Sequence, residues 1–394
     1  MMKYSFVIPS YNYKDYLVNC LESLNHQIGF GTGDYEVVVV DDGSNDGTYD
    51  AIHSKKFSFP LNYIYIKRTA NSCRNAARNT GWKNAKGEIV IFLDADMIVR
   101  KDYLQNLNQC YEMDNTIAVM GLRFMLSEPV SLEQIKDGAV FNISNPTSKP
   151  DMKYLEERHY FFNTLSYNAA SFDNPWLYFY SCNVSIPKKQ LLLVDGFNEN
   201  LPGWGFDDQE LGYRLFNAGV KIIINKQIEG LHQFHGEIYG MPSNEQKILQ
   251  WYRNVNLTYS LNKDLQRIAP KFKLLCCFAF KMVPSMSRRK YGFRKKHILK
   301  VRSKSSVEGM KESIKSLAAA QGNEIIVYDE LEDSDLHIWV QFLGRTESPV
   351  KYYPASRFFK KDSIEEHKKY LKRTYPRNRA LYLVKMALKA YART

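Results

Sequence analysis

Short apolar runs alternate with amphipathic segments along the first part of the chain. Residues 4–8, 36–40 and 88–93 are nearly continuous in apolar side chains, many of them β-branched, as is typical of strands covered on both faces of a sheet. Segments 13–26, 46–57 and 72–85 are expected helices, and 62–66 is a further short strand. This alternation predicts βαβ units and a parallel sheet.

The pattern continues with an expected helix at 102–113 and a strand at 117–126. Residues 127–174 are polar and aromatic, and we interpret them as a variable insertion. Periodicity returns with an expected strand at 177–186, helices at 188–194 and 207–217, and a strand at 220–225. We therefore place one large domain at 1–262, divided into halves at 1–126 and 127–262.

The rest of the chain is expected to be a basic segment and a small second unit. The basic amphipathic segment covers 263–306, and the small α/β or α+β unit covers 307–394. In that unit we expect helices at 307–320, 364–371 and 379–391, and strands at 324–328 and 336–342. The expected fold class is α/β, with a mostly parallel central sheet and a C-terminal appendage.

The chain has 394 residues and a net charge of +12, and its excess of basic residues is local. Residues 271–304 hold twelve Lys and Arg and no Asp or Glu. This segment is a solvated surface, a nucleic-acid patch or a membrane-surface element whose apolar side chains enter lipid. No nucleic-acid motif accompanies it.

The remaining composition favours an ordinary globular protein with a packed core. The first residues lack the apolar stretch of a signal peptide. The sequence also contains no run of roughly 20 apolar residues that would span a bilayer. The six cysteines show no metal-ligand spacing, and we interpret them as reduced packing residues. A cytoplasmic location is expected.

Acidic residues follow two of the expected strands. Asp41-Asp42-Gly43-Ser44 and Asp94-Ala95-Asp96 each come directly after an apolar run, and ligand sites in parallel sheets lie at the carboxyl ends of strands. Two carboxylates one residue apart can bind Mg²⁺ or Mn²⁺ and leave positions open for phosphate oxygens. An Asp-x-Asp sequence alone more often caps a helix. Two such clusters at one edge favour a cation, because like charges are costly to bury together.

These motifs, taken in order, resemble the family 2 glycosyltransferases with a GT-A fold. The matching segments are 9–12 (Pro-Ser-Tyr-Asn), 39–44, 77–81 and 92–96. The resemblance implies that Asp96 is a direct metal ligand, beside Asp94, and that Arg74 and Arg78 approach the diphosphate and sugar. The donor-binding set that it implies is Pro9, Tyr11, Asn12, Asp41, Asp42, Arg74, Arg78, Asp94 and Ala95.

A second block, 195–199 followed by 202–211, looks like the galactosyltransferase-type second half of bacterial chondroitin-type polymerases and β-1,4-galactosyltransferases. That resemblance implies acceptor contacts at Gly203, Trp204, Gly205 and Asp207, and a general base at Asp208. Phe206 replaces the usual glycine of the motif, and Asp207 replaces a glutamate. The acidic pair would also stabilise the N-terminus of the helix at 207–217, and both roles can hold together.

Related enzymes place a histidine metal ligand after the strand expected at 220–225. His232 is our preferred ligand, with His235 as its competitor.

The sequence as a whole predicts a metal-dependent inverting glycosyltransferase. It would move a sugar from a UDP-sugar to a hydroxyl of a saccharide or lipid-linked glycan in bacterial surface polysaccharide synthesis. A divalent Mn²⁺ or Mg²⁺ is the expected cofactor. Segment 271–304 would meet an anionic membrane at the cytoplasmic face of the inner membrane, and no nucleic-acid partner is expected. The alternatives are a nucleotidyltransferase, for which a Gly-rich, lysine-bearing phosphate loop is missing, and a non-catalytic carbohydrate-binding protein.

Overall fold

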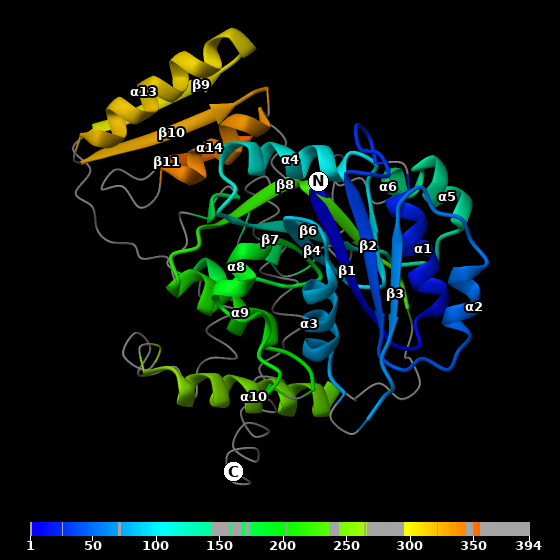
Figure 1. Cartoon of the computed structure of the whole chain (residues 1–394). Helices are drawn as coiled ribbons and strands as arrows, with labels where there is room; N and C mark the ends of the chain where they lie inside the picture. The colour runs from blue at the N-terminus through cyan, green and yellow to red at the C-terminus, as the bar shows by residue number, and fades with distance from the viewer. Residues whose placement is uncertain are drawn as a thin grey trace.

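An eight-stranded mixed sheet forms the centre of the computed structural model (Figure 1). Its order is β3-β2-β1-β4-β7-β6-β8-β5. The strands are β1 (Tyr4–Ser10), β2 (Tyr35–Asp41), β3 (Leu61–Tyr65), β4 (Ile89–Leu93), β5 (Met97–Val99), β6 (Ala118–Met125), β7 (Asn183–Pro187) and β8 (Ile222–His232). Pairing is parallel among β1 to β4 and between β6 and β8, whereas β7 and β5 run antiparallel to their neighbours. The expected α/β class with a mostly parallel sheet is confirmed.

The structure describes residues 2–25, 27–69, 72–143, 156, 158–159, 162, 167–169, 174–201, 203–235, 244–263, 265, 295–320, 322–331, 333–343 and 350–354. The core of the basic segment, 271–294, and the helices expected at 364–371 and 379–391 lie outside these residues. In the described part of the chain, no helix is both long enough and apolar enough to cross a membrane.

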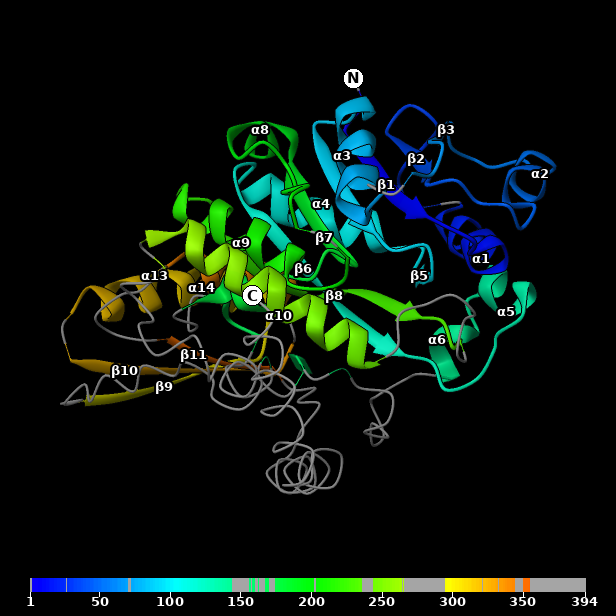
Figure 2. The ribbon, with the colours of Figure 1, turned by 90° about the horizontal axis from the view of Figure 1, so that it is seen from below.

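Helices cover both faces of the sheet, as its apolar strands require. In β2, Val37 and Val39 pack into one hydrophobic core, and Val38 and Val40 pack into the other. The first core includes residues of α1 (Lys14–Leu24) and α4 (Tyr103–Met113), and the second includes residues of α3 (Arg74–Asn84) and α9 (Asp207–Asn217). Among the described residues of this part, the other helices, seen from another side in Figure 2, are α2 (Thr48–His53), α5 (Leu132–Asp137), α6 (Val140–Ile143), α8 (Lys188–Leu193) and α10 (Asn244–Leu261), and a 3-10 helix, η3, covers Pro175–Tyr178.

Two expected strands differ from the structure in ways that matter for the site. The strand expected at 177–186 is shorter, because η3 and a turn precede β7. The strand expected at 220–225 is longer, because β8 continues to His232. Its extension pairs with the three-residue strand β5, which the sequence did not predict.

The C-terminal unit is a separate three-stranded parallel sheet of order β11-β10-β9 (Figure 1). It comprises β9 (Lys295–Val301), the 3-10 helix η4 (Lys304–Ser306), α13 (Val307–Ala319), β10 (Asn323–Asp329), α14 (Ser334–Phe342) and β11 (Val350–Pro354). Strand β9 lies within the range that we assigned to the basic segment. The strand expected at 336–342 is wrong, because these residues form α14.

Helix α14 is buried on opposite sides, which explains why its sequence looked like a strand. Leu336 and Val340 join the core of the small unit, whereas Ile338 joins a core of the main domain. The Gln341 amide accepts from the Ile224 N–H at 2.8 Å and donates to the Ile224 carbonyl at 2.7 Å. Strand β5 pairs with residues 230–232 of β8 and does not reach Ile224. The Gln341 side chain therefore makes the hydrogen bonds to Ile224 that a neighbouring strand would otherwise make. The two units are thereby joined by specific contacts.

Candidate active site

The carboxyl ends of β1 and β2 form a rigid turn region. Ser10 pairs with Asp41 in the sheet, and the buried Asp41 carboxylate accepts hydrogen bonds from the Ser44 N–H at 2.7 Å and from the Tyr63 hydroxyl. Asn12, at φ 52°, donates its N–H to Ser44 Oγ at 2.8 Å, and its side chain accepts from the Asn45 N–H. Asp41 and Asn12 therefore hold this edge in place.

Tyr11 and Asp42 lie together beside an arginine that the sequence analysis did not find. The Arg68 guanidinium stacks 3.7 Å from the centroid of the Tyr11 ring and forms an ion pair with Asp42. Burial raises the pKa of Asp42, although Arg68 opposes this effect. Tyr11 is 37% exposed, whereas Asp42 is buried, so a partly exposed aromatic residue lies beside a buried carboxylate where the resemblance implies a nucleoside pocket.

Asp96, His232 and His235 form a cluster that could hold a metal ion. One ligand atom from each lies within 4.8 Å of the others. Asp96 Oδ2 is 3.3 Å from His232 Nε2 and 3.4 Å from His235 Nε2. The antiparallel pairing of Met97 with His232 brings that histidine beside Asp96. The structure thus unites both candidate histidines with Asp96.

The residues of this cluster fit a divalent cation. His232 Nδ1 is 3.0 Å from the Gln233 carbonyl, so it carries the proton and leaves the Nε2 lone pair directed at Asp96, as in many metal-ligating histidines. Burial lowers the pKa of His232 and favours this neutral form. Burial opposes ionisation of Asp96, whereas positive charge on the two histidines lowers the pKa of Asp96, and a cation bound by neutral imidazoles would act in the same direction. Asp96 Oδ1 is buried with no hydrogen-bond partner in the described chain. A carboxylate and two imidazoles suit Mn²⁺ and related transition metals.

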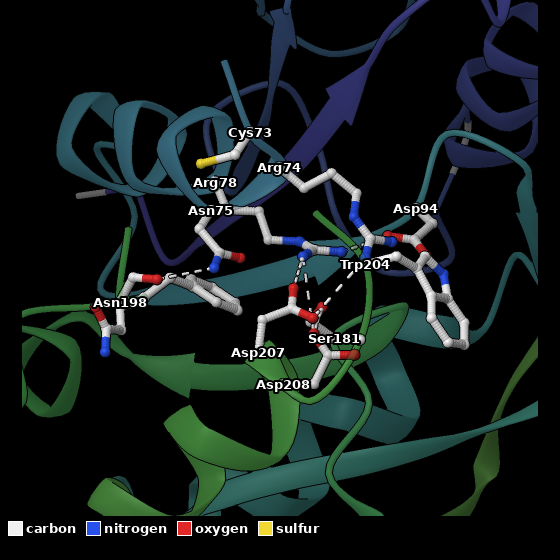
Figure 3. A network of polar contacts seen from close by, with 12 residues as sticks. Cys73, Arg74, Asn75, Arg78, Asp94, Ser181, Asn198, Trp204, Asp207 and Asp208 are labelled. Carbon is white, nitrogen blue, oxygen red and sulfur yellow. Dashed lines mark hydrogen bonds and ion pairs between the residues drawn. The ribbon is translucent and has the colours of Figure 1, made fainter. Parts of the chain in front are cut away.

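Asp94 is oriented toward a different partner, although it is only two residues from Asp96. Its Oδ1 lies 3.1 Å from the Arg78 guanidinium (Figure 3). Among the described residues, the candidate metal cluster does not include it. Ala95 between them is buried. The role of Asp94 as a second metal ligand stays a prediction.

Arg78 is the centre of a buried charge network (Figure 3). Its side chain is 1% exposed and contacts Asp94 and Asp207, each at 3.1 Å, and Asp208 at 3.7 Å. Burial disfavours the charged guanidinium, but these carboxylates raise its pKa and keep it protonated. Arg74, one helical turn earlier, is 40% exposed and lies 3.8 Å from Asp207. Donor contact by either arginine stays a prediction, and Arg74 is the more accessible of the two.

Asp208 has the environment of a general base. It lies in the first turn of α9, and its Oδ1 accepts a hydrogen bond from Ser181 Oγ at 2.5 Å. Burial and the neighbouring Asp207 raise the pKa of Asp208 to about 6, although Arg78 and Ser181 oppose this effect. A carboxylate with such a pKa is ionised at neutral pH and is a better proton acceptor than an ordinary aspartate.

Helix α10 packs against residues 203–205, the loop in which acceptor contacts are expected. The Gln250 side chain accepts from the Trp204 N–H at 2.9 Å, and Asn254 donates to the Gly205 carbonyl at 2.7 Å. A Cβ on Gly205 would approach Trp251 to 2.6 Å, and one on Gly203 would approach Gln250 equally closely. The Trp204 side chain is 41% exposed. The loop therefore presents a tryptophan beside the acidic pair.

The substitution at position 206 has a structural explanation. Phe206 is at φ 66°, in the left-handed region that glycine adopts without strain. Its ring is buried and packs edge-to-face on Trp251 at 5.7 Å. The ring packing offsets the backbone strain of a non-glycine residue at this position.

Comparisons with known proteins show which families the chain resembles. Residues 5–174 match the family model for Glycosyl transferase family 2. Residues 164–236 match the model described as N-terminal domain of galactosyltransferase. The two matches together cover the carboxyl ends of β1 and β2, the acidic pair Asp207 and Asp208, and both histidines. Residues 5–174 thus match family 2 and residues 164–236 match a galactosyltransferase-type domain, and the resemblance seen in the sequence is confirmed.

Individual relatives are similar over part of their length. The chain is 30% identical over 262 residues to the uncharacterized glycosyltransferase YfnE of Bacillus subtilis, a match that covers 59% of this chain and 65% of that protein. It is 29% identical over 279 residues to an Escherichia coli chondroitin synthase, which covers 68% of this chain and 38% of that protein. The chain thus spans less than two thirds of the length of either relative.

Among solved structures, the chain resembles the mannosyltransferase PcManGT from Pyrobaculum calidifontis in complex with GDP-Man and Mn²⁺. The sequence identity is 17%, the TM-score is 0.46, and the match covers 69% of this chain and 67% of that one. These values are too low to transfer a ligand or a mechanism.

Proposed function

We propose that this protein is a metal-dependent inverting glycosyltransferase that transfers a sugar from a UDP-sugar to a hydroxyl of a saccharide or lipid-linked glycan. The observation that carries the proposal is the meeting of three features at one edge of the sheet. These are the candidate metal cluster that contains Asp96, the Asp208 carboxylate with its raised pKa, and the exposed Trp204. The cluster would bind the cation of the donor, the carboxylate would act as the base, and the tryptophan would bind the acceptor sugar.

In the proposed reaction, Asp208 accepts the proton of the acceptor hydroxyl as the oxygen attacks the anomeric carbon. The bond from that carbon to the β-phosphate oxygen breaks, and UDP leaves with the electron pair. Trp204 positions the acceptor sugar, and Tyr11 and Asp42 bind the nucleoside. Attack from the face opposite the leaving group inverts the anomeric centre. Asp96, His232 and His235 would hold the cation, with Asp94 nearby, and such an ion would neutralise the charge that develops on the leaving diphosphate.

The charges of the described site favour this scheme. Three carboxylates, Asp94, Asp207 and Asp208, face two guanidinium groups, Arg74 and Arg78, and a fourth, Asp96, faces the two histidines. The diphosphate of a donor would add further negative charge. Desolvated like charges require a compensating cation, so we propose that the donor binds together with Mn²⁺ or Mg²⁺.

Biological context extends this proposal. A lipid-linked acceptor would place the enzyme at the cytoplasmic face of the inner membrane in bacterial surface polysaccharide synthesis. The basic segment 271–304 would then contact anionic headgroups. Most of that segment lies outside the described residues, so the support for membrane contact comes from its charge alone.

The deciding experiment measures UDP release and thermal stabilisation with UDP-glucose, UDP-galactose, UDP-N-acetylglucosamine and UDP-glucuronate, each with and without Mn²⁺. We expect Mn²⁺-dependent stabilisation by at least one donor, because a ligand that binds the native state raises its melting temperature. Asp208→Asn should abolish UDP release and retain this stabilisation. Asp96→Ala and His232→Ala should lose the Mn²⁺-dependent part.

Two surface variants serve as controls. Asp50→Asn and His53→Ala change exposed residues of α2, and both should behave as the wild type. Full UDP release by Asp208→Asn would refute the base assignment. Release of pyrophosphate instead of UDP would indicate a nucleotidyltransferase, and donor binding without turnover would indicate a binding protein.

A further inference from the structure

The turn before β7 contacts both sides of the candidate active site. Ser181 is fully buried, and its Oγ is 2.5 Å from Asp208 Oδ1 (Figure 3). The carbonyl of the next residue, Cys182, accepts a hydrogen bond from the Asp94 N–H at 3.3 Å. The sequence had predicted a continuous strand here, so it assigned Ser181 no role.

The contacts of Asp208 are unequal between its two oxygens. Ser181 and Arg78 both approach Oδ1, at 2.5 Å and 3.7 Å. In the described part of the chain, the Asp208 carboxylate makes no hydrogen bond or ion pair with any other side chain. The Asp208 side chain is 23% exposed. Among the described residues, Oδ2 makes no side-chain hydrogen bond or ion pair, so it is the oxygen that is available to receive a proton.

We propose that Ser181 is a positioning residue, whose hydroxyl fixes Oδ1 of Asp208 so that Oδ2 faces the acceptor hydroxyl. This inference rests on the proposed function, because it assigns Ser181 to the base of that reaction. A free carboxylate rotates about its terminal bond, and a buried hydrogen bond to one oxygen removes that freedom. Pre-oriented groups of this kind lower the barrier, because no reorientation is needed at the transition state.

The charges around Asp208 add a second effect. Asp207 on the same helix raises its pKa, whereas Arg74 and Arg78 from α3 and the Ser181 hydroxyl lower it. A hydrogen bond donated to a carboxylate favours the ionised form. Ser181 therefore keeps the base ionised close to neutral pH, in addition to orienting it.

The test uses the full chain and water as the acceptor, because the natural acceptor is unidentified. UDP release from the best-turned-over UDP-sugar is measured with Mn²⁺ over a pH range that brackets 6. Ser181→Ala is compared with Ser181→Thr, which keeps the hydroxyl. Ser185→Ala is the matched control, since Ser185 is an equally buried serine of β7 whose Oγ accepts from the Tyr111 hydroxyl at 2.7 Å.

We expect Ser181→Ala to lower kcat roughly 10- to 100-fold, the typical loss for a hydrogen bond to a charged group. The KM for the donor should stay near the wild-type value. The pKa that governs the acidic side of the kcat/KM profile should rise above its wild-type value of about 6, because the hydrogen bond that favours the ionised carboxylate is lost. Ser181→Thr should restore both kcat and the pKa seen in the kcat/KM profile, and Ser185→Ala should leave both at their wild-type values.

The outcomes separate this inference from the proposed function. A wild-type enzyme that releases no UDP from any donor would refute the proposed function itself. If the wild type is active, and Ser181→Ala is equally active with the same pKa in its kcat/KM profile, the role of Ser181 is overturned and the proposed function stands. Equal losses of kcat in Ser181→Ala and Ser185→Ala, with lowered melting temperatures and no change in the pKa of the kcat/KM profile, would also overturn the positioning role and would assign Ser181 a structural one.

Discussion

Arg78 should be the residue on which the stability of the site depends most. Its guanidinium is 1% exposed and pairs with Asp94 and Asp207 at 3.1 Å and with Asp208 at 3.7 Å. Arg78→Met keeps most of the side-chain volume and removes the charge. Breaking a buried ion pair from one side typically costs about 3–5 kcal/mol, because the partner charges stay buried without compensation. We expect a loss of this size in the free energy of unfolding.

The chain offers a matched control one helical turn away. Arg74 faces the same Asp207, but its side chain is 40% exposed and the separation is 3.8 Å. Solvent screening limits such a pair to less than about 1 kcal/mol, so Arg74→Met should unfold near the wild-type urea concentration. Urea unfolding at neutral pH, fitted with a common slope, gives both differences.

The loss should also depend on pH in a defined direction. Asp208 already has a pKa of about 6 in the folded protein, above the unfolded value of roughly 3.9, and the loss of Arg78, which lowers this pKa, raises it further. A carboxylate with a raised pKa in the folded state destabilises the protein increasingly as pH rises through that interval. The penalty of Arg78→Met should therefore be small in mild acid and full at neutral pH, and Arg78→Met with Asp207→Asn should recover part of it. A loss equal to that of Arg74→Met at neutral pH would refute the reasoning.

Two further predictions concern the base and the junction between the units. The kcat/KM for UDP release should fall below a pH of about 6, because Asp208 must be ionised to accept a proton; Asp207→Asn should move this limb to lower pH, since Asp207 raises the pKa of Asp208. Gln341→Leu should lose roughly 1–3 kcal/mol at the junction, because it leaves the buried Ile224 N–H and carbonyl without the amide that now bonds them. Scanning calorimetry should then show an earlier transition for the C-terminal unit, and a single transition at the wild-type temperature would contradict this.

Local patterns predicted well where the acidic residues lie at the ends of the parallel strands. The apolar runs that became β1, β2 and β4 placed Asp41 and Asp94 at the carboxyl ends of parallel strands, and the structure has them there. The α9 boundaries also agree, at 207–217. In each case the signal lies within a few residues of the position it predicts, so no knowledge of distant neighbours was needed.

Contacts between distant segments were not predictable in the same way. The β5–β8 pairing that brings His232 to Asp96 joins segments more than a hundred residues apart, and β5 has only three residues. Ser181 lies in an apolar stretch that reads as a strand, because the turn before β7 has no glycine or proline. Helix α14 is buried against two cores, which removed the polar face that normally reveals a helix.

The most informative difference concerns Asp94-Ala95-Asp96 itself. The sequence pattern predicts one metal site made by both carboxylates, whereas in the structure Asp96 faces two histidines and Asp94 faces Arg78. Arg78 also contacts Asp207 and Asp208, which belong to the galactosyltransferase-type half. The triplet therefore belongs to two networks, the candidate metal cluster and the carboxylates around Arg78, which under the proposed function would serve the leaving group and the base. Arg78 contacts both Asp94 and Asp208, and because its side chain is 1% exposed, solvent screens little of its interaction with either carboxylate.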